Sequence, residues 1–489
     1  MAEFTGLKSV LWPIHKFELK KFLPMAFIMF CILLNYSLLR VMKDSLVVTT
    51  MGASVIPTLK LWFVIPSTIL LVIIYSKLVN VFSKDSVFYI MVTFFMGYFI
   101  LFATVLYPYH QHLHADFSDV SSGLLAGLGL LKPIDHWVFS SFYVMAELWG
   151  SSMISLMFWR FANDVTSIKE SKRFYAMFLC IANFGLVTTC FFVKALNEER
   201  LDVSEWSALP YFILIIVLSC LVIIGLYYWL NNDVLKDSRY YNPDEIKKPK
   251  EKTKLSMLES LKYIFKSKYL GYITILLICY GISINLIEVV WKEQVRLLYP
   301  TKAGYSSFMG SLNLYTGIFT IICTLIGTNI LRRCSWFVGA IITPITFFIT
   351  GLVFFAFIVF KEQLTPIVTP LGLTILGIVI SFGFVQNFLS KGIKYSFFDP
   401  TKEMCYIPLD DELKSKGRAA ADIVGARVGK GGGSFIQYML LNVIFIGSSL
   451  VQLVPVIAVI FIVILLLWFV AVFGLNKKFL HLITNDDVK

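Results

Sequence analysis

The chain has 489 residues, of which 57% are hydrophobic and only 15% are charged, and its net charge is +12. Soluble proteins carry about 25% charged residues, so this composition excludes an ordinary soluble protein. Apolar runs of about 20 residues recur along the chain, which is long enough to cross a bilayer core, and a β-barrel would show short alternating segments instead. The sequence predicts an all-α polytopic membrane protein.

The excess of Lys and Arg indicates membrane orientation before it indicates nucleic acid, because cytoplasmic loops collect these residues. The chain has eight Cys and no CxxC pair, which predicts ordinary thiols and neither a disulfide framework nor a metal site. We expect no signal or transit peptide before the first apolar run.

About twelve spans are predicted, in chain order. Those of the first half cover residues 23–42, 59–80, 88–107, 136–159, 174–195 and 210–231. Those of the second half cover residues 269–290, 308–331, 336–360, 366–389, 434–448 and 452–474. With this topology most basic loops fall on one side, so both termini are expected in the cytoplasm.

A polar, Lys-rich stretch separates the two sets of spans. We therefore predict a six-helix bundle at 1–231, a basic cytoplasmic linker at 232–268 and a second six-helix bundle at 269–489. Two six-helix halves are typical of major-facilitator transporters, which hold their substrate near the bilayer midplane between the halves.

The first span ends in charge. Arg40, Lys43 and Asp44 follow an almost wholly apolar run, although a charged residue at the centre of a span costs about 2.5–3.5 kcal/mol. Snorkelling of the cations to the membrane surface is one explanation. Two close cations beside the polar pair Asn35 and Tyr36 favour a binding site for an anion.

Two carboxylates lie inside other spans. Glu147 is about a dozen residues into the fourth span, where it acts either as a structural partner of another span or as a coupling or gating carboxylate. Glu288 precedes Lys292 by four residues, so the two could form a local pair on one helix face. Its depth also makes Glu288 a candidate pathway residue.

The segment 386–437 is the most polar part of the second half, and a solvated basic loop is one interpretation. Its stretch AAADIVGARVGKGGG is rich in Ala and Gly, which favours close helix packing in membranes. We interpret this stretch as the start of a discontinuous eleventh span whose cations face a cavity. Its glycines would let backbone N–H groups approach phosphate oxygens.

Two other motifs give only weak indications of function. GARVGKGGGS does not have the GxxxxGK[ST] spacing of a phosphate-binding loop, so no ATP hydrolysis of that type is expected. In HQHLH, residues 110–114, alternate His side chains would share a face if the segment were a strand and could then bind a metal. The sequence offers no catalytic constellation, so neither an enzyme nor a cofactor is predicted.

Several long segments resemble the non-mitochondrial ATP/ADP translocases, the nucleotide transporters of plastids and obligate intracellular bacteria. They include LLNYSLLRVMKDSLVVT, FYVMAELWGSSMISLMFWRFAN, INLIEVVWK, LSKGIKYSFFDPTKEMCYIPLD and KGRAAADIVGARVGKGGGSFIQ, and the resemblance runs from about residue 8 to 478. It implies a major-facilitator-like carrier that imports ATP in exchange for ADP and phosphate. Other members import several ribonucleotides, some with protons, and a few carry NAD.

The resemblance also places the family's important charges on Lys43, Glu147, Glu288 and Lys416. KGRAA stands where the family often has KGKAA, and GKGGG where it often has GKSGG, which leaves the substrate preference open. Lack of a transit peptide favours a bacterial member in the inner membrane. We expect a monomer that needs only its nucleotides and the bilayer as partners.

The predicted substrate site has three parts. The phosphate clamp comprises Arg40, Lys43, Lys394, Lys416, Arg418 and Lys430. The residues expected to stack on or read the base are Asn35, Tyr36, Trp149, Asn183, Tyr280 and Asn387. Glu147 and Glu288 would pair with the cations in the empty site, which would enforce exchange, whereas a proton on either would permit symport. A carrier of another anion such as a sugar phosphate, a membrane-embedded enzyme, and a channel or scaffold are the competing hypotheses.

Overall fold

The computed structural model describes residues 12–114, 124–198, 206–241, 259, 262, 264, 267–333, 335–409 and 417–486. Throughout these residues the regular structure is helical, and no strand occurs among them. Ten of the described helices are long and apolar enough to cross a membrane. The prediction of an all-α polytopic membrane protein is confirmed.

The N-terminal group of helices runs from α2 to α12. Its long members are α2 (Leu19–Met51), α3 (Val55–Leu59) continuing into α4 (Ile65–Val81), α5 (Lys84–Leu101), α9 (Trp137–Trp149) continuing into α10 (Trp159–Val165), α11 (Ile168–Glu198) and α12 (Leu209–Trp229). Its short members are η1 (Lys16–Glu18), α6 (His110–Leu113), α7 (Leu124–Gly127) and α8 (Leu131–Asp135).

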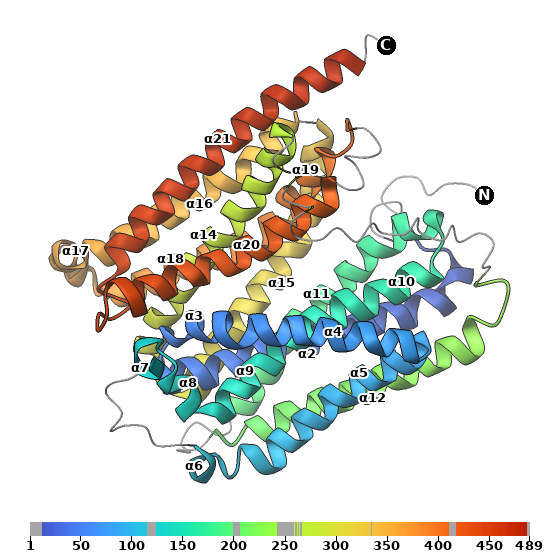
Figure 1. The fold of residues 1–489 in the computed structure, drawn as a ribbon, viewed down its shortest axis with the longest axis horizontal. Coiled ribbons are helices and arrows are strands. Elements are labelled where there is room, and N and C mark those ends of the chain that lie inside the picture. The colour runs from blue at the N-terminus through green and yellow to red at the C-terminus, as the bar shows by residue number, and fades with distance from the viewer. Residues whose placement is uncertain are drawn as a thin grey trace.

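The C-terminal group runs from α14 to α21. Its members are α14 (Lys268–Leu298), α15 (Lys302–Arg333), α16 (Trp336–Val359), α17 (Lys361–Val368), η6 (Thr369–Leu371), α18 (Ile375–Ile393), α19 (Asp399–Met404), α20 (Arg418–Met439) and α21 (Val454–Asp486). In Figure 1 this group fills the upper part of the molecule and the N-terminal group fills the lower part.

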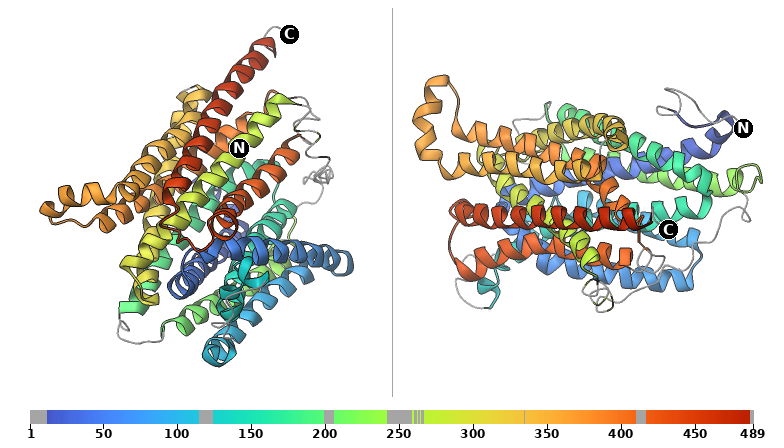
Figure 2. Two further views of the ribbon diagram at one scale, coloured as in Figure 1. Left: turned by 60° about the vertical axis from the view of Figure 1, so that its left-hand side comes forward. Right: turned by 90° about the horizontal axis from the view of Figure 1, so that it is seen from above.

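The two groups of helices pack against each other along a shared interface. Helix α15 packs against α2 and α11, and α20 packs against α3. The start of α2 and the end of α21 lie toward the same end of the molecule in Figure 1 and in the right-hand view of Figure 2. Toward that end the two groups diverge, so the molecule is joined at the opposite end.

Several long helices contain a wider, π-helical turn. These turns are η2 (Lys60–Val64), η3 (Phe102–Leu106), η4 (Gly150–Phe158), η5 (Leu230–Val234), η7 (Lys394–Phe398) and η9 (Leu440–Ile444). Such turns often mark functional positions. Lys60 and Lys394 each begin one, and η4 starts three residues after Glu147.

The prediction of a discontinuous eleventh span is wrong. Helix α20 runs unbroken from Arg418 into the π-helical turn that ends at Ile444, so it also begins well before residue 434. Four of its five glycines pack against α14: a Cβ on Gly281 would lie 2.5 Å from the carbonyl carbon of Gly429. The absence of side chains at these glycines therefore allows close helix packing, as Ala/Gly-rich membrane helices prefer.

Two further local predictions are also wrong. The tenth span begins at Ile375 and not at residue 366, because the chain turns at Gly372, whose φ of +72° is left-handed. The segment HQHLH is helical at α6 and not a strand, so its three His do not share a face. No group of three or more His, Cys, Asp or Glu is placed to hold a metal within the described ranges.

Candidate functional site

Six charged side chains form a cluster where the two groups of helices meet. This central cluster comprises Arg40, Lys43 and Asp44 on α2, Glu147 on α9, and Glu288 and Lys292 on α14. Three cations therefore face three carboxylates. Asp44 is fully buried, and the side chains of Lys43 and Lys292 are no more than 5% exposed.

Lys43 is held from three directions. Its Nζ lies 2.9 Å from Glu147 Oε1 and donates to Asp44 Oδ1 at 3.1 Å. The same ammonium lies 4.0 Å from the ring centroid of Tyr143, which adds a cation–π contact. A buried cation needs such compensation, because removing one partner of a buried pair costs about 3–5 kcal/mol.

The cluster crosses from one group of helices to the other. Asp44 Oδ2 lies 2.9 Å from Lys292 Nζ, so Asp44 bridges a lysine from each group. Arg40 Nη2 donates to Glu288 Oε1 at 2.6 Å, which is a second crossing. Lys292 also lies 3.3 Å from Glu288, as the four-residue spacing predicted. In this structure Glu147 pairs with Lys43, and Glu288 pairs with Arg40 and Lys292.

Four more lysines face the same region and have no carboxylate within ion-pair distance among the described residues. These unpaired lysines are Lys60, Lys391, Lys394 and Lys430. The charge of Lys391 acts on Arg40 and Glu288, and that of Lys430 acts on Lys394 and Glu147. Cations therefore outnumber carboxylates around the central cluster, which suits a polyanion.

Two of the unpaired lysines have neutral partners. Lys60 Nζ donates to Asn285 Oδ1 at 2.8 Å, across the interface between the groups. Lys394 Nζ lies 5.6 Å from the ring centroid of Tyr280 and 5.0 Å from that of Tyr395. Neither contact neutralises the ammonium, so both charges stay available to a ligand.

Arg418 lies in a different place. Its Nη2 is 2.6 Å from Glu403 Oε2, and with Lys402 and Asp422 it forms a peripheral cluster inside the C-terminal group. Arg418 precedes Lys430 by twelve residues on one helix, which is about 18 Å at 1.5 Å per residue. The structure does not bring Arg418 to the central cluster. Lys416 lies outside the described residues.

The amide candidates are engaged by backbone groups. Asn35 is fully buried, and its Nδ2 donates to Ile216 O at 3.4 Å on α12. Asn183 Nδ2 donates to Leu179 O at 2.8 Å, and Asn387 Nδ2 donates to Gly383 O at 2.9 Å, each within its own helix. Each amide nitrogen thus has a backbone partner, whereas Asn35 Oδ1 and Asn387 Oδ1 are buried without a hydrogen-bond partner among the described residues.

The aromatic candidates lie nearer the charges. The ring of Tyr36 packs on Gly150, where an added Cβ would lie 2.5 Å from a ring carbon. Tyr36 also interacts electrostatically with Arg40 and Glu147. The ring of Tyr280 stacks on Phe398 at 4.9 Å beside Lys394. The third aromatic candidate, Trp149, is fully buried, and its Nε1 donates to Ile32 O at 3.2 Å, so Tyr36 and Tyr280 are the better candidates for stacking on a base.

Lys60 was missed at the sequence level. It stands alone between VIPTL and LWFVIP, at the edge of a predicted span, where snorkelling explains it. A lone cation between two apolar runs was the available signal. Nothing in the sequence indicates that Asn285, far along the chain, is its partner.

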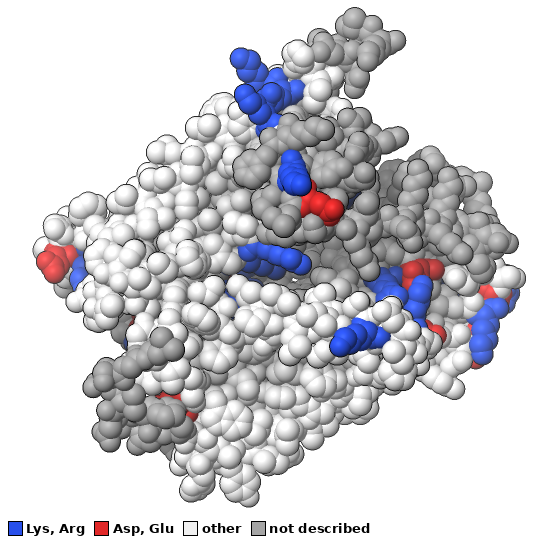
Figure 3. Space-filling view, viewed as in Figure 1, with Lys and Arg blue, Asp and Glu red and all other residues white. Residues whose placement is uncertain are grey.

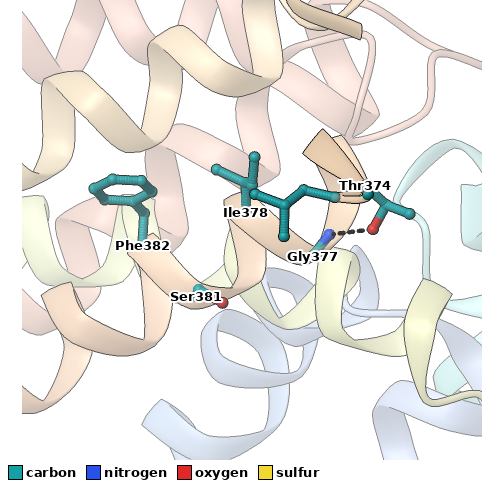
Figure 4. Close-up of a pocket in the computed structure, with 7 residues that line it drawn as sticks. Thr374, Gly377, Ile378, Ser381 and Phe382 are labelled. Atoms are coloured by element: carbon teal, nitrogen blue, oxygen red, sulfur yellow. Dashed lines mark hydrogen bonds between the residues drawn. The ribbon is translucent and has the colours of Figure 1, made fainter. Parts of the chain in front are cut away.

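In the space-filling view the surface is hollowed near the middle of the seam between the two groups, with a Lys or Arg side chain at its edge, and other Lys and Arg side chains are spread toward the right and the top of this face (Figure 3). A separate pocket lies at the start of α18, lined by Gly372, Leu373, Thr374, Gly377, Ile378, Ser381 and Phe382 (Figure 4). No charged side chain lines that pocket, so it does not suit a polyanion.

Contacts between the groups concentrate at the end opposite the termini. There the backbone N–H of Ala53 donates to Glu293 Oε2 at 2.7 Å, and Tyr438 Oη donates to Leu128 O at 3.2 Å. Asn197 Nδ2 at the end of α11 donates to Ser306 Oγ near the start of α15 at 2.7 Å. We call this the joined end.

At the end where the termini lie, the ion pairs stay within one group. Lys21 pairs with Glu170 at 2.9 Å and Lys84 with Asp164 at 2.7 Å, both inside the N-terminal group. The peripheral cluster does the same inside the C-terminal group. Among the described residues no ion pair connects the two groups at this open end.

A histidine group sits at the joined end, outside the spans. The rings of His114 and His136 lie 4.9 Å apart, and Lys302 of α15 reaches within 5.3 Å of the neighbouring ring of Phe139. Burial, with the charges of His136 and His110, lowers the pKa of His114 to about 4. This side chain is therefore neutral near pH 7.

Solved structures of similar fold are transporters. The chain matches a bacterial homologue of the iron transporter ferroportin with a TM-score of 0.57 at 14% identity, over 94% of this chain and 98% of that one. It matches the xylose transporter XylE from E. coli with a TM-score of 0.53 at 12% identity, over 92% and 97%. At these identities the likeness shows a shared fold and nothing further.

Sequence comparison is more specific. The TLC ATP/ADP transporter model matches residues 1–479. ADP,ATP carrier protein 1 of Rickettsia typhi is 46% identical over 99% of this chain and 98% of its own length. The corresponding protein of Chlamydia muridarum is 45% identical over 98% and 92%. The chain belongs to the TLC ATP/ADP transporter family.

Proposed function

We propose that the protein exchanges ATP for ADP and phosphate across a membrane by alternating access. The observation that carries the proposal is the excess of cations in the hollow between the two groups of helices. ATP and ADP are polyanions, and a partly buried, cation-rich hollow concentrates and orients such ligands. The printed names of the relatives, ADP,ATP carrier proteins, support the choice of nucleotide.

Binding would rearrange the central cluster. Phosphate oxygens compete with Glu147 for Lys43 and with Glu288 for Arg40, because charge-assisted bonds to phosphate match those to carboxylate. The Arg40–Glu288 contact crosses the interface, so its loss weakens the joined end. The ligand thereby changes the relative stability of the two arrangements, as alternating access requires.

Exchange follows from the unpaired lysines. Closing the hollow around Lys60, Lys391, Lys394 and Lys430 without an anion would remove uncompensated charges from water, which is costly. A bound nucleotide supplies the opposite charge in both directions of travel. The empty carrier then returns slowly, and transport becomes exchange.

The membrane setting completes the proposal. The twelve spans predicted from the sequence would return the chain to the side where it started, and the basic loops favour the cytoplasm for that side. The open end then faces the cytoplasm of a bacterium whose inner membrane holds the protein. We propose a two-bundle monomer that transports its nucleotides unchanged and is not an enzyme.

Proteoliposomes test the exchange. We expect vesicles loaded with ADP to take up labelled ATP at least about tenfold faster than empty vesicles. Equal uptake by empty vesicles would overturn exchange. The same assay with GTP, CTP, UTP and NAD, with and without a pH gradient, tests the alternative of a proton-coupled importer of several ribonucleotides or of NAD.

A further inference from the structure

Lys60 occupies a distinctive position in the interface. It is the first residue of the π-helical turn that joins α3 to α4, so a local widening of the helix sets its direction. Its Nζ donates to Asn285 Oδ1 at 2.8 Å on α14. This bond connects the two groups of helices beside the central cluster, and the charge of Lys60 acts on Glu147 and Glu288.

The partner of Lys60 is fixed and neutral. Asn285 Nδ2 donates to Gly281 O at 2.8 Å, and a Cβ on Gly433 would lie 2.7 Å from the Cβ of Asn285. The amide is therefore held by its own helix and by α20, with its oxygen directed to Lys60. Each of the three cations of the central cluster, by contrast, holds a carboxylate.

This difference makes Lys60, like the other unpaired lysines, available to a ligand at a lower cost than the cations of the central cluster. Moving a cation of the central cluster from a carboxylate to a phosphate breaks an ion pair, and for Lys43 it leaves Glu147 without another ion-pair partner among the described residues. Moving Lys60 from Asn285 breaks only a bond between a charged and a neutral group. A phosphate entering from the open end therefore takes Lys60 at a lower cost in free energy than it takes Lys43 or Arg40.

We propose that Lys60 is a phosphate-binding residue for nucleoside di- and triphosphates, and that its transfer from Asn285 to the ligand releases one of the contacts joining the two groups of helices. The inference rests on the proposed function. It assigns Lys60 a role in recognising the phosphates and coupling their binding to opening of the joined end.

The test measures the affinity of the purified protein for ATP, ADP and adenosine. Lys60→Gln is expected to weaken ATP and ADP binding at least about tenfold and to leave adenosine binding unchanged, and Lys60→Arg is expected to retain most of the affinity. Lys84→Gln is the matched control, because Lys84 is an exposed lysine paired with Asp164 outside the hollow. It should bind like the wild type.

Asn285→Asp tests the same step with Lys60 intact. A carboxylate at this position would form an ion pair with Lys60, so ATP and ADP should again bind at least about tenfold more weakly. This variant decides the matter if Lys60→Gln does not fold. Failure of the wild type to bind ATP or ADP would overturn the proposed function. Normal nucleotide affinity of a folded Lys60→Gln or Asn285→Asp protein, with a binding wild type, would overturn only the role of Lys60.

Discussion

The central and peripheral clusters are built from the same residue types and differ in what they connect. In the central cluster, Asp44 is fully buried and is paired with lysines from both groups of helices. In the peripheral cluster, the Arg418 side chain is 49% exposed and its carboxylate partners belong to its own group. Burial and crossing of the interface, and not the number of charges, make an ion pair relevant to a conformational change.

The largest effect is expected for Lys43→Ala. Glu147 and Asp44 would both lose a partner inside the protein, at a cost of about 3–5 kcal/mol for a broken buried pair. Uptake of labelled ATP into ADP-loaded vesicles, measured per amount of inserted protein, should fall at least tenfold. Lys402→Ala in the peripheral cluster is the matched change, because its ion pairs stay within one group of helices, and it should reduce uptake less than about twofold. Normal uptake by the Lys43→Ala variant would show that Lys43 does not belong to the substrate site.

Asp44→Asn is expected to act on stability. The neutral amide keeps the size of the side chain but weakens its contacts to Lys43 and Lys292, so the interface between the two groups loses its buried bridge. The temperature of unfolding in detergent should fall clearly, whereas Asp422→Asn in the peripheral cluster should change it little. Equal shifts for the two variants would show that crossing the interface confers no special role.

A smaller effect is expected on acidification. The pKa of His114 is lowered to about 4 in the folded protein, and an unfolded His titrates near 6.5, so the unfolded state binds more protons between these values. Stability should therefore decrease as pH falls from about 6.5 toward 4. His114→Gln should flatten part of this decrease in a thermal-unfolding series. An identical pH profile for the variant would exclude the contribution.

The smallest effect is expected for Arg418→Gln. Its ion pair with Glu403 is largely exposed, and such pairs contribute about 0–1 kcal/mol. The KM for ATP in the exchange assay should change less than about twofold. A loss of ten times or more would place Arg418 in the substrate path after all and remove the distinction between the two clusters.

Much of the site was predictable because a charged side chain inside an apolar span costs free energy whichever helices the span packs against. Arg40, Lys43, Glu147 and Glu288 all stood out for that reason, and the structure places them together. The bridge from Asp44 to Lys292 was not predictable. It depends on α2 and α14 lying side by side, and helical periodicity within one segment does not determine which distant segment is its neighbour.

The basic stretch near α20 was harder to interpret for a related reason. A run of cations predicts a polar surface, but only the helix direction separates Lys430, which faces the hollow, from Arg418 about three turns away. The glycines were equally ambiguous. Close packing of Gly429 on Gly281 is possible because glycine has no side chain, and approach of a phosphate would depend on the same feature. Only the positions of the two helices decide between the two interpretations.

In the proposed mechanism, nucleotide binding in the hollow separates the joined end and brings the open end together. Spin labels at Lys84→Cys and Lys477→Cys, one on each group of helices near the open end, report that motion in a variant whose eight native Cys are replaced. Pulsed electron–electron double resonance should show the distribution of distances between the two labels shifting to shorter values when ATP or ADP is added. Adenosine should leave this distribution unchanged. An unchanged distribution in a variant that still exchanges nucleotides would contradict the account.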